Sequence, residues 1–163
     1  MVEQFSSIYQ RAAERKGGTA ALETLLGQPL SSAQLMRYSN ADWLSAFSKK
    51  VFQSGFVWRV VEQKWPGFRE VFFDFVPEKI LLLSDEMLAE KAADPRIIRN
   101  AGKVLSIQAN ALMIHELEQE HGSFTELIAQ WPGERIIELW ALLKKRGARL
   151  GGNTGAYSLR AMG

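Results

Sequence analysis

The stretch LKKRGARLGGNTGAYS, from Leu143 to Ser158, joins a basic helix end to a glycine-rich turn and the start of a second helix. Helical spacing ends near Arg146 and resumes at Asn153 or Thr154. Glycine accepts positive φ and lets backbone N–H groups approach a ligand, because it has no Cβ. The unpaired N–H groups at the start of the second helix add further donors. The turn is therefore typical of an anion-binding hairpin aimed at a phosphate group.

A simpler interpretation of the turn stays open on spacing alone. Gly147 is placed to end the first helix in a left-handed conformation, after cations that suit the helix dipole. Leu150 is the large apolar residue of the turn, and we expect it to pack between the two helices. An ordinary tight turn with a cationic cap would show the same residues.

Apolar residues elsewhere recur at helical spacing, and no segment alternates like a half-buried strand. Phe68, Phe72 and Phe75 form a stripe that we expect to lie in the core. The sequence thus predicts one compact all-α domain over residues 1–163, with eight to ten helices and a helix-hairpin-helix arrangement at its C-terminal end.

Two prolines predict helix boundaries. Pro66, followed by Gly67, predicts the end of a helix. Asp94 before Pro95 predicts the start of a long helix that ends at Gly122, since an N-cap residue followed by proline is a frequent helix start.

Composition excludes several kinds of site. The chain has no cysteine, which rules out disulfide scaffolds, cysteine nucleophiles and thiolate zinc sites. Its only histidines, His115 and His121, are too few for an ordinary histidine metal site. We expect neither a metal nor a cofactor. No apolar run approaches the length of a membrane span and the first residues lack a signal-peptide core, so we expect a soluble, cytoplasmic protein.

Charge is unevenly distributed along the chain. The net charge is only +2, but no acidic residue follows Glu138, and five cations do: Lys144, Lys145, Arg146, Arg149 and Arg160. This end favours an anionic partner, although a solvated basic tail would look the same.

The order helix, G-x-x-L-G-G-x-T-G, helix resembles the helix-hairpin-helix motif of the DNA glycosylase superfamily. The chain is most similar to the DNA-3-methyladenine glycosylase I family, through QSGFVWRVV at 53–61, DPRIIRNAGKVLSIQANA at 94–111 and the stretch at 143–158. These segments follow the family's order and spacing. Gly55, Phe56, Val57 and Trp58 fit the family form of a glycine, a bulky apolar residue, any residue and a tryptophan.

The resemblance implies an N-glycosyl hydrolase of base-excision repair. Such an enzyme flips an alkylated purine, for example 3-methyladenine, out of double-stranded DNA and hydrolyses its glycosidic bond without cutting the backbone. A cationic base stacks well on an indole face and leaves readily, so little acid–base machinery is needed. We expect a monomer. The implied base pocket comprises Trp58, Lys50, Gln53 and Tyr9, the DNA wedge Gly55 and Phe56, and the backbone-binding hairpin Gly147, Arg149, Gly151, Gly152 and Thr154.

The chain departs from the family in several ways. Lacking cysteine, it cannot form the family's zinc clip. Lys50 stands where family members place a base-binding glutamate, which makes activity on 3-methyladenine doubtful, and Gln53 is the nearby candidate to replace it. No acidic residue stands where the superfamily carries a catalytic aspartate after the hairpin, so no catalytic residue is assigned and we expect the chain to be truncated at its C-terminal end. Asn153 stands where lyases of the superfamily carry a lysine, so we expect no lyase activity through that position.

Two other hypotheses remain. Lys50 and the missing aspartate are also compatible with a non-catalytic DNA-binding module of the same fold, which would bind DNA in a salt-sensitive manner. A helical protein-interaction domain, in which the glycine turn is only a turn, would have no affinity for DNA at low salt.

Overall fold

The computed structural model describes residues 2–163, and within that range it contains helices and no strand. This confirms the all-α prediction, and the eleven α-helices slightly exceed the expected eight to ten. Two short 3₁₀ turns, Phe73–Phe75 and Gly133–Arg135, complete the secondary structure of this range. None of the helices in it is long and apolar enough to cross a membrane.

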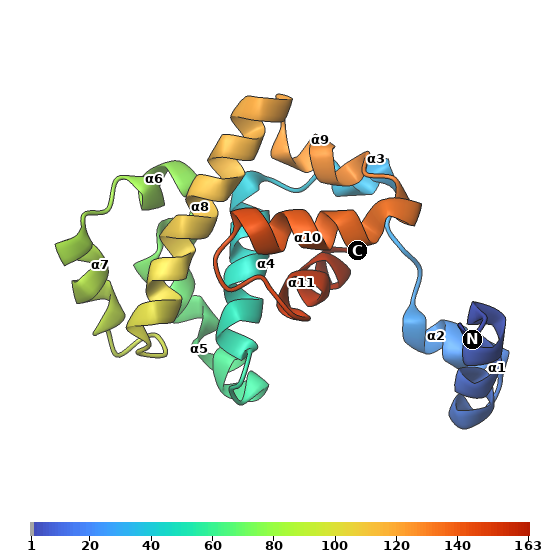
Figure 1. Cartoon of the computed structure of the whole chain (residues 1–163). Helices are drawn as coiled ribbons and strands as arrows, with labels where there is room; N and C mark the ends of the chain where they lie inside the picture. Colours follow the sequence, from blue (N-terminus) through green and yellow to red (C-terminus); the bar gives the residue numbers. More distant parts are fainter. Residues whose placement is uncertain (1) are drawn as a thin grey trace. The chain divides into compact units, whose positions relative to one another are not determined.

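The described chain divides into two compact units (Figure 1). One extends up to Leu30 and includes Gly163, and the other runs from Ser31 to Met162. A single domain over residues 1–163 therefore stays a prediction. The first unit contains two helices that pack on each other, α1 (Phe5–Lys16) and α2 (Thr19–Leu26).

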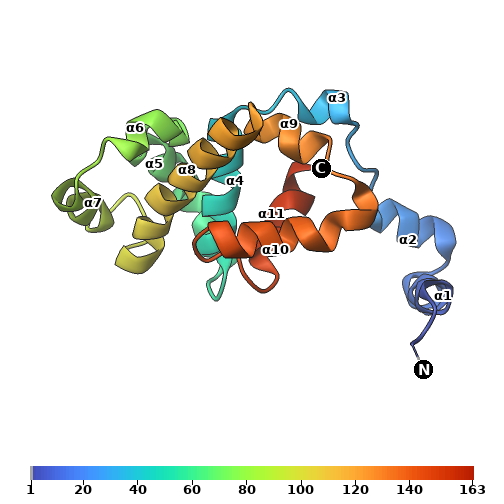
Figure 2. The same ribbon diagram turned by 45° about the horizontal axis from the view of Figure 1, so that its top comes forward.

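The second unit is built around two helices. They are α4 (Asn40–Gln53) and α8 (Ala101–His121), which pack on each other. In both views α4 lies between α8 and α11 (Thr154–Met162) (Figure 1 and Figure 2). The remaining helices of this unit are α3 (Ser32–Leu35), α5 (Trp58–Val71), α6 (Pro77–Leu81), α7 (Asp85–Ala92), α9 (Phe124–Ala129), α10 (Ile136–Arg146) and α11 (Thr154–Met162).

Aromatic side chains fill the middle of the second unit. Phe68, Phe72 and Phe75 are fully buried, which confirms the predicted stripe. Phe52 of α4 meets Phe68 of α5 edge-on, with ring centroids 4.6 Å apart. Such contacts add to the stabilisation from hydrophobic burial.

The predicted helix end at Pro66 is wrong. Helix α5 continues through Pro66 to Val71. Proline removes one N–H, but the turn that follows carries Phe68 and Val71 into the core, and their burial outweighs the lost hydrogen bond. Gly67 serves packing here, because a Cβ would lie 2.5 Å from the carbonyl oxygen of Arg96.

The predicted helix start at Asp94 is also wrong. Helix α8 begins at Ala101, where Asn100 accepts a hydrogen bond from the amide of Lys103 at 3.0 Å. Asp94 instead accepts from the amide of Arg96 at 2.8 Å and closes a local turn. That turn places Ile97, which is 1% exposed, in the core. Burial of this side chain therefore favours the turn over a helix that starts at Asp94.

Candidate nucleic-acid interface

The glycine turn joins α10 to α11 at the predicted residues. Helix α10 ends at Arg146, α11 starts at Thr154, and Leu150 is 2% exposed between them. These three expectations are confirmed. We call residues 147–153 the hairpin.

Gly147 plays a different part from the one expected. Its φ is −91° with ψ 173°, so it is extended rather than left-handed. A Cβ at this position would lie 2.6 Å from a methyl group of Leu150 and 2.8 Å from the carbonyl oxygen of Leu143. Glycine is needed because the hairpin folds tightly back on α10, whereas the left-handed positions are Arg149 and Gly152, each with φ 58°.

A buried amide of α8 holds the hairpin in place. The Asn110 side chain is 0% exposed, and its Nδ2 donates to the carbonyl oxygen of Ala148 at 3.0 Å. The amide of Ala148 donates back to Oδ1 of Asn110 at 2.7 Å. One side chain therefore satisfies both backbone groups of a hairpin residue.

The far side of the hairpin keeps its donors available. The amides of Gly151, Gly152 and Asn153 donate no hydrogen bond to any residue in the range 2–163, and Gly152 and Asn153 are exposed. The amide of Thr154 donates to the carbonyl oxygen of Gly151 at 3.2 Å. Free amides in succession at a helix start form a site for an anion.

Gly151, Gly152 and Asn153 lie across a cleft of about 390 Å³ from the end of α4 and the start of α5. The cleft has a size typical of small-ligand sites. Two stretches far apart in the sequence form its two walls. They are Lys50, Gln53, Ser54, Gly55 and Trp58 on one side, and Gly151, Gly152, Asn153, Thr154 and Tyr157 on the other.

Trp58 and Lys50 form the polar and aromatic wall of the cleft. Trp58 is 53% exposed, which excludes a place in the core. Nζ of Lys50 lies 4.6 Å from the centroid of the Trp58 ring, a cation–π distance. The same Nζ donates to Oε1 of Gln53 at 3.0 Å.

A short hydrogen-bond chain sets the position of Lys50. Gln53, 2% exposed, donates from Nε2 to Glu62 at 3.0 Å, and Glu62 also accepts from Lys49 at 3.0 Å. Partial burial lowers the pKa of Lys50; the charge of Glu62 partly offsets this, and that of Lys49 adds to it. Gln53 thus orients Lys50 toward the indole.

The loop between α4 and α5 projects beside the cleft. Gly55 has φ 69°, a left-handed value that glycine accepts without strain, and Phe56 follows at 44% exposure. Lys103 of α8 holds this loop, because its Nζ donates to the carbonyl oxygens of Ser54 at 2.7 Å and Phe52 at 3.3 Å.

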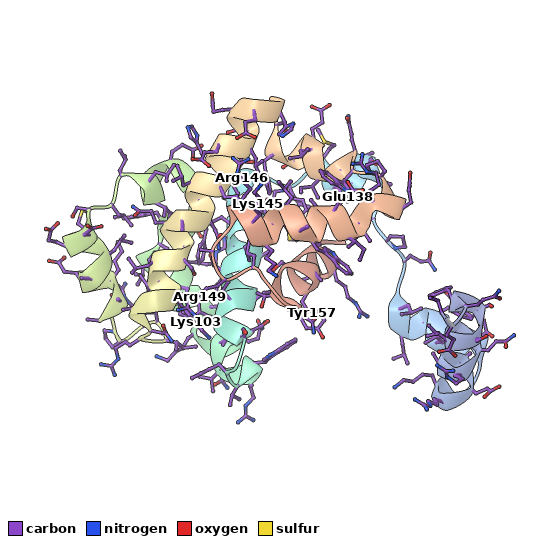
Figure 3. The ribbon with its side chains drawn as sticks, viewed as in Figure 1. Lys103, Glu138, Lys145, Arg146, Arg149 and Tyr157 are labelled. Carbon is purple, nitrogen blue, oxygen red and sulfur yellow. The ribbon has the colours of Figure 1, made fainter. Side chains whose placement is uncertain are left out.

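Two cations meet where this loop approaches the hairpin. Lys103 lies next to Arg149 (Figure 3). Burial and then the charge of Arg149 lower the pKa of Lys103. Arg146 behaves differently, since it pairs with Glu116 at 3.3 Å and Glu120 at 2.6 Å on α8. The basic end predicted from the sequence is therefore partly neutralised, and Arg149 is the hairpin's own cation.

The structure brings most predicted site residues together. Seven of them line the cleft: Lys50, Gln53, Gly55, Trp58, Gly151, Gly152 and Thr154. Phe56, Gly147 and Arg149 do not line it, although each belongs to a segment that does. Tyr9 lies in the first unit, where its hydroxyl donates to Glu23, and its place in a base pocket stays a prediction.

Sequence analysis missed three residues of this region, Ser54, Tyr157 and Asn110. Tyr157 lines the cleft one helical turn after Thr154, so helical spacing from the hairpin could have indicated it. Asn110 could not have been found in this way, because its partner lies 38 residues further along the chain.

Known proteins share both the sequence pattern and the fold. The sequence model of the methyladenine glycosylase family matches residues 37–163. DNA-3-methyladenine glycosylase 1 of Escherichia coli (strain K12) is 27% identical over 137 residues, which cover 68% of this chain and 73% of that protein.

Solved structures agree. A structure of 3-methyladenine DNA glycosylase I from Staphylococcus aureus, which describes the structural basis of 3-methyladenine recognition, superposes on this chain with a TM-score of 0.66. It is 20% identical, and the match covers 93% of this chain and 88% of that one. A tyrosine-to-phenylalanine variant of 3-methyladenine DNA glycosylase I in complex with 3-methyladenine gives a TM-score of 0.65 at 20% identity, over 91% and 87% of the two chains. With the family match spanning most of its length, the chain belongs to the methyladenine glycosylase family.

Proposed function

We propose that this protein is a monofunctional DNA glycosylase of base-excision repair that removes alkylated purines, of which 3-methyladenine is one, from double-stranded DNA. The relatives named above are DNA-3-methyladenine glycosylases. The observation that carries the proposal is the cleft that the half-exposed Trp58 shares with Gly151, Gly152 and Asn153, whose amides donate no hydrogen bond to residues 2–163. We further propose that the protein acts as a monomer in the cytoplasm, associated with the nucleoid.

Each part of the cleft has a task in base flipping. The amides of Gly151 and Gly152, with the guanidinium of Arg149, bind a backbone phosphate of the damaged strand. Phe56 enters the vacated place in the base stack, since its side chain is 44% exposed on the loop that borders the cleft. Trp58 stacks on the extruded purine. Tyr9 is proposed as a further contact of the base.

The chemistry asks little of the protein when the base is cationic. Cleavage of the C1′–N9 bond leaves both electrons on the base, so a base that already carries a positive charge departs neutral. Water supplies the hydroxyl group at C1′. The residues of the cleft then act by orientation and by excluding competing contacts rather than by proton transfer.

One observation favours a second candidate, a DNA-binding module without catalysis. The ammonium group of Lys50 already occupies a face of the Trp58 ring. If it stays there when DNA binds, the protein would hold a flipped nucleotide without a stacked base.

Release of free bases from DNA treated with a methylating agent tests the proposal. The wild-type protein should release modified purines, and Trp58→Ala should lower the rate by about 5- to 150-fold, because stacking of a base on an aromatic side chain contributes about 1–3 kcal/mol. Trp140→Ala serves as the control, since Trp140 lies on α10, is 37% exposed and does not line the cleft. If the wild-type protein and the Trp140→Ala control bind DNA but release no base, the second candidate is established instead.

A further inference from the structure

The ammonium group of Lys103 keeps one N–H donor for a ligand. Its Nζ donates to the carbonyl oxygens of Ser54 at 2.7 Å and Phe52 at 3.3 Å, and an ammonium group has three donors. The same Nζ lies 5.9 Å from the centroid of the Phe52 ring. The positive charge of Lys103 is therefore held at the start of the loop that carries Phe56.

Arg149 brings a second cation to this place from the hairpin. A Cβ added to Gly102 would lie 2.6 Å from Nη2 of Arg149, so the guanidinium group packs on the residue next to Lys103. The two side chains lie next to each other in Figure 3. Arg149 has φ 58°, a left-handed value that is unfavourable for a residue with a side chain. The hairpin thus holds the guanidinium group beside α8 in spite of this strain.

No carboxylate in the described part of the chain pairs with either cation. Arg149 forms no hydrogen bond or salt bridge there, whereas Arg146, at the end of α10, is paired with two carboxylates of α8. Burial, and then the charge of Arg149, lowers the pKa of Lys103, and no acidic group raises it again. Since the two charges repel each other, an anion bound between them is stabilised by both.

We propose that Lys103 and Arg149 together bind one backbone phosphate of the damaged strand, and that this phosphate joins the hairpin to the loop that carries Phe56. The inference rests on the proposed function, because it adds Lys103 as a ligand of the phosphate that Arg149 binds there.

A phosphate group suits this pair by charge and by geometry. A guanidinium group offers parallel N–H donors to two phosphate oxygens, and the remaining N–H of Lys103 adds another charge-assisted hydrogen bond. Lys103 also holds the carbonyl groups of Ser54 and Phe52, so the bound phosphate sets the position of the loop relative to the strand. Lys103 is therefore a positioning residue for Phe56 as well as a phosphate ligand.

Duplexes that contain a tetrahydrofuran abasic site test the proposal. In each duplex of a series, a different phosphate near that site is replaced by a neutral methylphosphonate, and the dissociation constant is measured for wild type, Lys103→Met and Arg149→Met at fixed salt. On the unmodified duplex both variants should bind about tenfold more weakly than wild type, since each lacks charge-assisted hydrogen bonds to the phosphate.

The series then shows whether the two cations share a phosphate. Wild type should lose about tenfold in affinity at one methylphosphonate position. At that same position the loss in each variant should shrink to about threefold or less, because one of the two cations is already absent. At the other positions the variants should lose as much affinity as wild type does.

Lys64→Met is the matched control. Nζ of Lys64 also donates to two backbone carbonyl oxygens, those of Pro95 at 2.8 Å and Ile97 at 3.3 Å, and Lys64 does not line the cleft. This variant should show the wild-type loss at every position.

The possible failures of the two proposals differ. If Lys103→Met and Arg149→Met reduce the loss at different phosphates, or at none, the shared phosphate is refuted, while base release from methylated DNA still supports the glycosylase. The expected pattern without any base release would support the shared phosphate and overturn the glycosylase. If wild type binds none of the duplexes, both proposals are wrong.

Discussion

Removal of the Asn110 side chain should loosen the hairpin and weaken DNA binding together. Asn110→Ala deletes both hydrogen bonds to Ala148, at 3.0 and 2.7 Å. A buried backbone group left without its partner costs about 1–3 kcal/mol. Ala148 is half-buried, so water recovers part of this, and we expect a loss of about 2–3 kcal/mol in the free energy of unfolding. For a domain of this size the melting temperature should fall by about 4–12 °C.

The same substitution should also weaken DNA binding, because it alters the shape of the hairpin. In the proposed binding mode, the amides of Gly151 and Gly152 need the shape of the hairpin to bind a phosphate, so DNA would have to order the hairpin again in the variant. We expect about a tenfold rise in the dissociation constant for an abasic-site duplex, equal to about 1.4 kcal/mol. Fluorescence anisotropy at fixed salt and well below the melting temperature measures it.

Gln108→Ala separates this effect from general destabilisation. Gln108 also lies on α8, and its Nε2 donates to the carbonyl oxygens of Ile80 at 3.1 Å and Leu83 at 2.8 Å, away from the hairpin. The control should melt earlier but bind DNA like wild type. Equal DNA affinities for the two variants, despite similar losses of stability, would refute the idea that Asn110 shapes the phosphate site.

Three further expectations address other parts of the second unit. Arg149→Glu should weaken DNA binding at least tenfold at low salt and reduce the slope of log K against log salt by about 1–2, as read from binding titrations at several salt concentrations. Gly155→Ala should lower the melting temperature by several degrees, because the new Cβ would lie 2.7 Å from a hairpin carbonyl oxygen, whereas Gly133→Ala, with open space around the Cβ, should not. The hydrogen bond from a neighbouring arginine holds the pKa of Asp94 at about 2, below the ordinary value of 3.8, so its stabilising contribution is present above pH 4 and is lost as the pH falls toward 2. Thermal melts between pH 2 and 6 should show a shallower acid loss for Asp94→Asn than for wild type.

Local sequence signals predicted well those features that neighbouring residues control. The hairpin limits at Arg146 and Thr154 follow from helical spacing interrupted by glycines. The aromatic stripe at Phe68 and Phe72 follows from apolar periodicity, because burial of one helix face is what drives the fold. Proline signals failed, since at Pro66 and Asp94 the burial of a core side chain outweighed the local preference.

The sequence by itself determined the all-α class, the place of the glycine hairpin and the order of segments that marks the family. Only the tertiary structure decided which groups face one another: the Lys50 ammonium on the Trp58 ring, the Asn110 amide against Ala148, and the Lys103 contact with the loop before Phe56. The physical reason is that these contacts join residues on different helices or loops. Their distances depend on how the helices pack, which no local pattern specifies.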